Sequence, residues 1–120
     1  MITPSGPDFI ALQVRNLEAS ADYYKNVFGF EVIEQGPPHA VVLKSSTITM
    51  ALRSPMHPLP DTGPLGVGMV LWVACKDANE LQEMIISRGG SIVAPLSDSP
   101  FGPFFVAEDP DGYKITFHTG

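Results

Sequence analysis

The feature that most constrains the fold is an order of elements that the chain uses twice. Each half opens with an apolar stretch, continues with apolar residues at helical spacing and then reaches a glycine, Gly29 in the first half and Gly89 in the second. Superposing Val14 on Val73 brings these glycines within one residue of each other. The sequence therefore predicts two tandem βαβββ units of about 60 residues each.

The two units share the same predicted elements. Asn16 is a candidate helix cap in the first unit, and Asp77 begins the helix of the second. The predicted strands cover residues 9–14, 30–35, 40–44 and 47–52 in the first unit, and 67–74, 91–94, 104–107 and 113–117 in the second. This mixture of strands and helices predicts the α+β class.

A proline-rich stretch, residues 54–65, separates the two units, which cover about 8–53 and 66–119. Its prolines exclude a helix interior or a central strand. Because the stretch is too short to separate independent domains, we expect a linker or lid within one domain, residues 1–120.

The composition limits the classes of partner. The chain has 13 acidic and 7 basic residues and a net charge of −6, which argues against nucleic acid and anionic membranes as partners. Cys75 is the only cysteine, so an internal disulfide is excluded. We find no leader sequence and no long apolar run, and we expect a cytoplasmic protein.

The segment 108–117 predicts a tight turn between two strands. Asp109 and Asp111 can bond to their own backbone, Pro110 sets its own φ, and Gly112 supplies a positive φ. The segments on both sides of the turn are rich in residues with high β-strand propensity.

Together with residues 14–20 and the helix exit at 23–30, this closing hairpin resembles the vicinal oxygen chelate superfamily, the glyoxalase, bleomycin-resistance and extradiol-dioxygenase group. The resemblance implies two βαβββ modules whose strands form a cupped mixed sheet, with a small-molecule ligand in the cavity. It also implies a homodimer. Whether the modules pair within one chain or across a dimer stays open.

Metal-dependent members of this superfamily draw ligands from the first and last strands of each module. The matching positions here are Phe9, Gly68 (or Met69 if the alignment slips) and Thr116. Phe, Gly and Met offer no suitable donor for a divalent cation, and a lone Thr hydroxyl is a poor one. We therefore expect no metal and no cofactor at the usual place.

The first-ranked residue for ligand binding is Trp72, which shares a face with Gly68 by strand alternation. Its indole offers a rigid platform for a planar or cationic ligand. An alternative is that the ring fills the space that metal and substrate occupy in chelating relatives.

Four further side chains are candidates for the same cavity. Thr116 and His118 are two residues apart and share a face, although His118 also fits a polar residue at a strand end. Gln13 shares the face of Phe9 and offers an amide, unless backbone groups satisfy it. Phe104 adds aromatic surface near the closing hairpin.

These observations favour a metal-independent binding protein of the glyoxalase/bleomycin-resistance type that sequesters an aromatic or cationic compound such as an antibiotic. Sequestration needs only a concave apolar site with a few polar groups. The alternative is a glyoxalase-like lyase or a dioxygenase with an atypical metal site.

Overall fold

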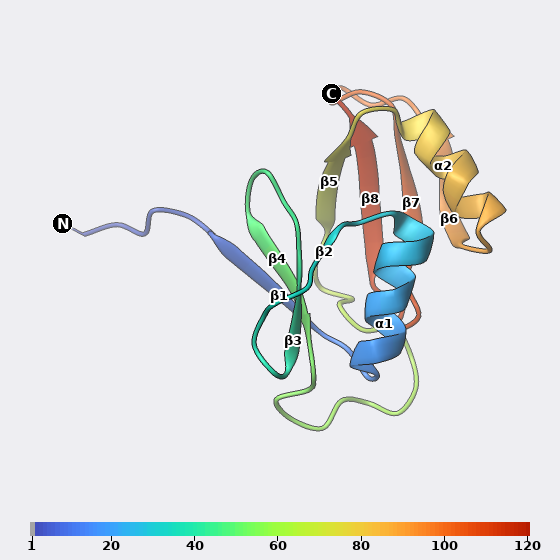
Figure 1. Ribbon diagram of the computed structural model, residues 1–120. Coiled ribbons are helices and arrows are strands. Elements are labelled where there is room, and N and C mark those ends of the chain that lie inside the picture. Colours follow the sequence, from blue (N-terminus) through green and yellow to red (C-terminus); the bar gives the residue numbers. More distant parts are fainter. Residues whose placement is uncertain (1) are drawn as a thin grey trace.

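A computed structural model describes residues 2–120 and contains two modules with the same order of elements (Figure 1). The first module consists of β1 (Phe9–Gln13), α1 (Leu17–Tyr23), the wider helical turn η1 (Tyr24–Phe28), β2 (Val32–Ile33), β3 (Ala40–Leu43) and β4 (Thr49–Arg53). The second consists of β5 (Leu71–Cys75), α2 (Ala78–Ser87), β6 (Ser91–Ser97), β7 (Phe104–Glu108) and β8 (Lys114–Thr119). The predicted α+β class and the two βαβββ modules are confirmed.

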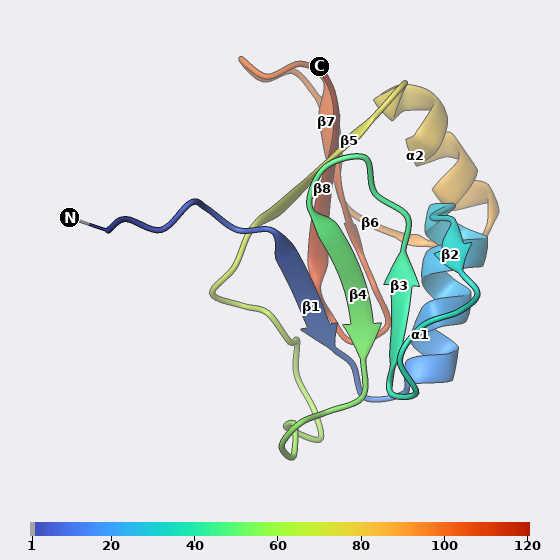
Figure 2. The same cartoon turned by 60° about the vertical axis from the view of Figure 1, so that its left-hand side comes forward.

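Each module forms its own four-stranded sheet. Sheet A has the order β1-β4-β3-β2, and Figure 2 shows β1, β4 and β3 side by side. Sheet B has the matching order β5-β8-β7-β6. In both sheets the first strand runs parallel to the last and lies at the edge, so β1 and β5 each have one side without a strand partner in residues 2–120.

The helix ends define how the two modules correspond. Asn16 caps α1 and Asp77 caps α2, each accepting a bond from a backbone amide three residues on. Aligning these caps also places Gly29 on Gly90 and Phe9 on Val70. The sequence-based superposition, which placed Phe9 on Gly68, was therefore wrong by two residues. Gly68 lies in a turn before β5, where the amide of Met69 bonds to the carbonyl of Gly66 at 3.1 Å.

The inner faces of the two sheets share one core. The ring of Phe28 lies 5.4 Å, between centroids, from that of Phe117 on β8. Leu52 of β4 and Phe105 of β7 are also buried there, and each such side chain contributes about 1.5–3 kcal/mol. Residues that alternate with these along each strand lie on the opposite, outer face of their sheet.

The turn at 109–112 ties the second module to the first. Asp109 accepts bonds from the amides of Asp111 and Tyr113 at 2.8 and 2.9 Å, which fixes the turn itself. Its other oxygen accepts a bond at 2.7 Å from the hydroxyl of Tyr24, in the first module. Burial raises the pKa of Asp109, and burial together with the neighbouring Asp109 raises that of Tyr24. As predicted, Gly112 has a positive φ, 86°.

Asp111 makes the second connection between the modules. Its carboxylate accepts a bond from the hydroxyl of Ser20 at 3.3 Å and forms an ion pair with Arg15 at 3.5 Å. We call the group Arg15, Ser20, Tyr24, Asp109 and Asp111 the module latch. No helix within residues 2–120 is both long and apolar enough to cross a membrane.

We expect Tyr24→Phe to destabilise the protein by about 1–3 kcal/mol, because it leaves a buried oxygen of Asp109 without its donor. Tyr23→Phe is the matched control, since its hydroxyl meets a backbone carbonyl at 3.2 Å in a part-buried position. Urea unfolding measures both variants. Equal losses in the two would contradict a special role for the bond between Tyr24 and Asp109.

Candidate ligand-binding site

An aromatic cluster lies on the outer face of sheet B. Trp72 is at its centre, with ring centroids of Phe101, Phe104 and His118 at 5.9, 5.7 and 5.3 Å. Strand register brings them together, because Trp72 pairs with Thr116 and His118 pairs with Phe104. Trp72 remains 42% exposed, so part of its ring is free to contact a ligand.

Phe101 reaches this cluster from the loop between β6 and β7. The hydroxyl of Ser99 holds the loop by donating to the carbonyl of Gly102 at 2.7 Å and accepting from the amide of Phe101 at 3.0 Å. Gly102 has a φ of 100° and lies so close to the backbone of Thr119 that a Cβ would clash. The loop therefore presents Phe101 in a defined position against Trp72.

His118 is the polar member of the cluster. Its Nδ1 is buried and has no hydrogen-bond partner within residues 2–120. Because this nitrogen is closed to solvent, a ligand atom would reach it only after neighbouring side chains moved. The aromatic cluster thus combines three apolar rings with one imidazole whose Nδ1 is buried.

A pocket of about 380 Å³ lies beside the cluster on the same outer face. Val70, Val106, Lys114 and Thr116 line its sheet side. The end of the linker (Pro64 and Leu65) and the residues that follow it (Gly66, Val67 and Met69) line the rest, together with Gly112. Ligand pockets in proteins have volumes of about 300–1,000 Å³, so this space suits a small molecule. We call it the linker pocket.

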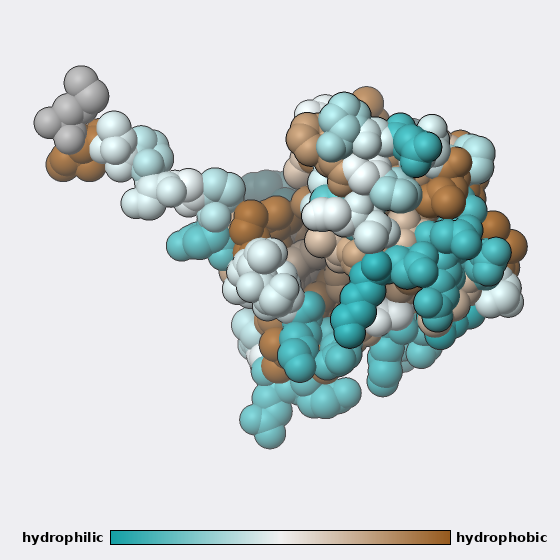
Figure 3. Space-filling view, turned by 90° about the horizontal axis from the view of Figure 1, so that it is seen from above, coloured by the Kyte–Doolittle hydropathy of each residue, from teal (hydrophilic) through white to brown (hydrophobic). Residues whose placement is uncertain are grey.

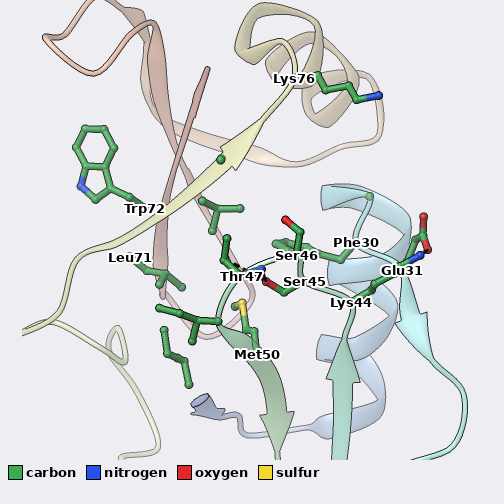
Figure 4. Close-up of a pocket in the computed structure, with 15 residues that line it drawn as sticks. Phe30, Glu31, Lys44, Ser45, Ser46, Thr47, Met50, Leu71, Trp72 and Lys76 are labelled. Atoms are coloured by element: carbon green, nitrogen blue, oxygen red, sulfur yellow. Dashed lines mark hydrogen bonds and ion pairs between the residues drawn. The ribbon is translucent and has the colours of Figure 1, made fainter. Parts of the chain in front are cut away.

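A second hollow, of about 580 Å³, lies between the two modules. Figure 3 shows it from above, with apolar atoms at its base. Ser45, Ser46 and Thr47 stand on one side and strand β5 on the other, whereas Trp72 points away from it (Figure 4). The hollow runs along the free edge of β5, and Trp72 both lines it and belongs to the aromatic cluster.

Comparison with known proteins assigns the family. The profile of the Glyoxalase/Bleomycin resistance protein/Dioxygenase superfamily matches residues 6–117. The chain belongs to this superfamily. A lactoylglutathione lyase of Neisseria meningitidis serogroup A is 32% identical over 116 residues, covering 88% of this chain and 84% of the lyase.

Two solved structures of this superfamily's fold illustrate its range. TnmS3, an antibiotic-binding protein from Streptomyces sp. CB03234, matches with a TM-score of 0.74 and 20% identity, over 99% of this chain and 98% of its own. A lactoylglutathione lyase from Agrobacterium tumefaciens matches with a TM-score of 0.72 and 21% identity, over 98% and 95%. At these identities the likeness establishes the fold alone.

The residues at the superfamily's metal positions do not fit a divalent cation. Cap alignment and strand register identify these positions as Phe9 and Ala51 in sheet A and Val70 and Thr116 in sheet B. Three of them offer only hydrocarbon, and a lone hydroxyl is a poor ligand. Within residues 2–120, moreover, no group of three or more His, Cys, Asp or Glu side chains is arranged to hold a metal.

The structure brings together four of the seven residues predicted to bind a ligand. Trp72, Phe104, Thr116 and His118 share the outer face of sheet B. Phe9 and Gln13 lie on the outer face of sheet A, where the amide oxygen of Gln13 accepts a bond from Met56 at 2.8 Å. Gly68 stands in the turn before β5 and has open space around it.

Sequence reasoning left two residues of this face, Lys114 and Phe101, out of the predicted site. Lys114 lines the linker pocket, and its alternation with Thr116 was the available signal. Phe101 was not among the predicted site residues, because no pattern predicts the course of its loop. Burial raises the pKa of the Cys75 thiol, which lies 3.5 Å from the carbonyl of His118, so this cysteine is a weak nucleophile.

Replacing Phe101 with alanine should expose more of Trp72, the only tryptophan in the chain. We expect a red-shifted emission and stronger acrylamide quenching, with a stability loss below about 1 kcal/mol because Phe101 is 68% exposed. Ile86→Ala, an exposed site on α2, serves as control. Unchanged Trp72 fluorescence in Phe101→Ala would show that the two rings do not pack in solution.

Proposed function

We propose that this protein is a metal-independent binding protein that sequesters a planar aromatic small molecule, such as an antibiotic. The observation that carries the proposal is the aromatic cluster around Trp72, half exposed and adjoining a pocket of about 380 Å³. Stacking on an aromatic ring contributes about 0.5–1.5 kcal/mol beyond the area that it buries. A preformed platform of this kind suits binding without chemistry.

The metal positions support binding over catalysis, whereas the comparisons include both an antibiotic-binding protein and lactoylglutathione lyases. One structural neighbour, TnmS3, is an antibiotic-binding protein with the same fold. At the positions where chelating members of the superfamily hold their metal, Phe9, Ala51 and Val70 provide no donor. A ligand on sheet B would therefore be held by aromatic surface and hydrogen bonds.

A glyoxalase-like lyase, or a dioxygenase with an atypical metal site, is the second candidate. The 32% identity with a lactoylglutathione lyase is the observation that favours it. The unpartnered Nδ1 of His118 would then be the group to move a proton, because it faces no competing partner within residues 2–120.

We propose further that the protein is a homodimer and is cytoplasmic. The free edges of β1 and β5, together with exposed Val70 and Phe9, leave surfaces that a second copy would cover. A free Cys75 is in keeping with a reducing compartment.

Screening planar aromatic compounds tests the binding function. We expect at least one compound to quench Trp72 fluorescence and raise the melting temperature of protein that holds less than one equivalent of metal. Trp72→Leu should lower the affinity for that compound about fivefold in a thermal-shift titration, because the stacking interaction is lost. Ile86→Ala should leave binding unchanged.

One tightly bound equivalent of a transition metal, together with lactoylglutathione lyase activity, would favour the second candidate. Failure of every compound to bind would remove the main support for sequestration.

Sedimentation velocity tests the dimer. We expect a dimer at micromolar concentration, and Ala11→Glu should shift it toward monomer, because Ala11 is exposed at the centre of edge strand β1. Ala19→Glu adds the same charge at an exposed position of α1 and should leave the dimer intact. A monomeric wild-type protein would exclude the proposed assembly.

A further inference from the structure

We propose that the ligand is an organic anion, a planar aromatic ring that carries a carboxylate, with the anion bound by Lys114. This inference rests on the proposed binding function and narrows its ligand class. It narrows the expected ligand, an aromatic or cationic compound, to an aromatic anion.

The strand register places the backbone of Lys114 at a defined distance from Trp72, the centre of the aromatic cluster. Lys114 and Thr116 lie on the same face of β8, about 7 Å apart along the strand, and Thr116 is directly opposite Trp72. Thr116 and Lys114 both line the linker pocket, and Val70, two residues before Trp72, lines its other side. A ring over Trp72 would therefore direct a substituent into the pocket toward Lys114.

The charges around the pocket favour an anion. Among residues 2–120, Lys114 is the only charged residue that lines it, and the other lining residues are apolar apart from Thr116. Asp109 and Asp111, although close in sequence, use their carboxylates within the module latch. Apolar walls strengthen the attraction between an ammonium group and a bound carboxylate, because they reduce screening by water.

Two carboxylates, Glu108 and Asp111, line a second pocket together with Lys114, and Asp111 is paired with Arg15, which leaves Glu108 to compete for Lys114. The two residues are opposite each other in the register of β7 and β8. They form no ion pair within residues 2–120, where the ion pairs join Arg15 to Asp111 and Lys44 to Glu31. The ammonium group of Lys114 thus has no fixed carboxylate partner and is available to a ligand.

A matched set of probes tests this inference: 2-naphthoate, 2-naphthylmethanol and 2-naphthylmethylammonium, titrated against Trp72 fluorescence. We expect the naphthoate to bind about tenfold more tightly than the ammonium compound, with the neutral alcohol between them. Added salt should reduce this difference, since it screens the charge on Lys114.

Variants assign the effect to Lys114. Lys114→Gln should lower the affinity for naphthoate about fivefold and leave the affinity for the alcohol unchanged. Glu108→Gln should raise the affinity for naphthoate. Lys25→Gln makes the same change of net charge at an exposed site on η1 and should have no effect.

The outcomes distinguish failure of the anionic ligand class from failure of the proposed aromatic binding function. One contrary result is that the ammonium compound binds as tightly as naphthoate, and another is that Lys114→Gln lowers the affinity for all three probes equally. Either result would overturn the proposal that the ligand is an anion and would leave the proposed aromatic binding site standing. If none of the three probes binds, both the anionic class and the aromatic site are overturned.

Discussion

The two carboxylates of the module latch set the relative position of everything else. Asp109 and Asp111 belong to one short turn of the second module, but they meet Tyr24, Ser20 and Arg15 of the first. Burying a carboxylate is costly, so the turn stabilises the fold only while each oxygen meets a donor. Because those donors stand on α1, on η1 and just before α1, the latch holds this helical segment against the end of sheet B.

Local chemistry made much of the fold predictable. Asp, Pro and Gly each have a specific role in a tight turn, and the structure gives Gly112 the positive φ that the sequence requires. The correspondence between modules failed because valines within an apolar strand are interchangeable by pattern. Helix caps carry more information, since Asn16 and Asp77 each have one possible place in the motif. A slip of two residues preserves the face of a strand, which is why the face of Trp72 was still predicted correctly.

The candidate site was predictable only where strand alternation defines it. Trp72, Thr116 and His118 follow from period two together with the pairing of β5 and β8. Phe101 and the linker pocket depend on the paths of two loops, which are set by tertiary contacts such as that of Gly112 with Pro64. A net charge of −6 likewise gave no information about the sign of charge beside Lys114, because most carboxylates lie on other surfaces.

Removing metal ligands from this fold changes how a ligand can be held. A chelated cation supplies strong, directional attraction for oxygen atoms of a substrate. With Phe9, Ala51 and Val70 at those positions, affinity has to come from aromatic area and from weaker polar contacts. A single lysine beside an apolar pocket partly replaces the lost cation, because it attracts an anion without a coordination shell. The outer face of sheet B would then favour aromatic anions, and it would bind them without activating them.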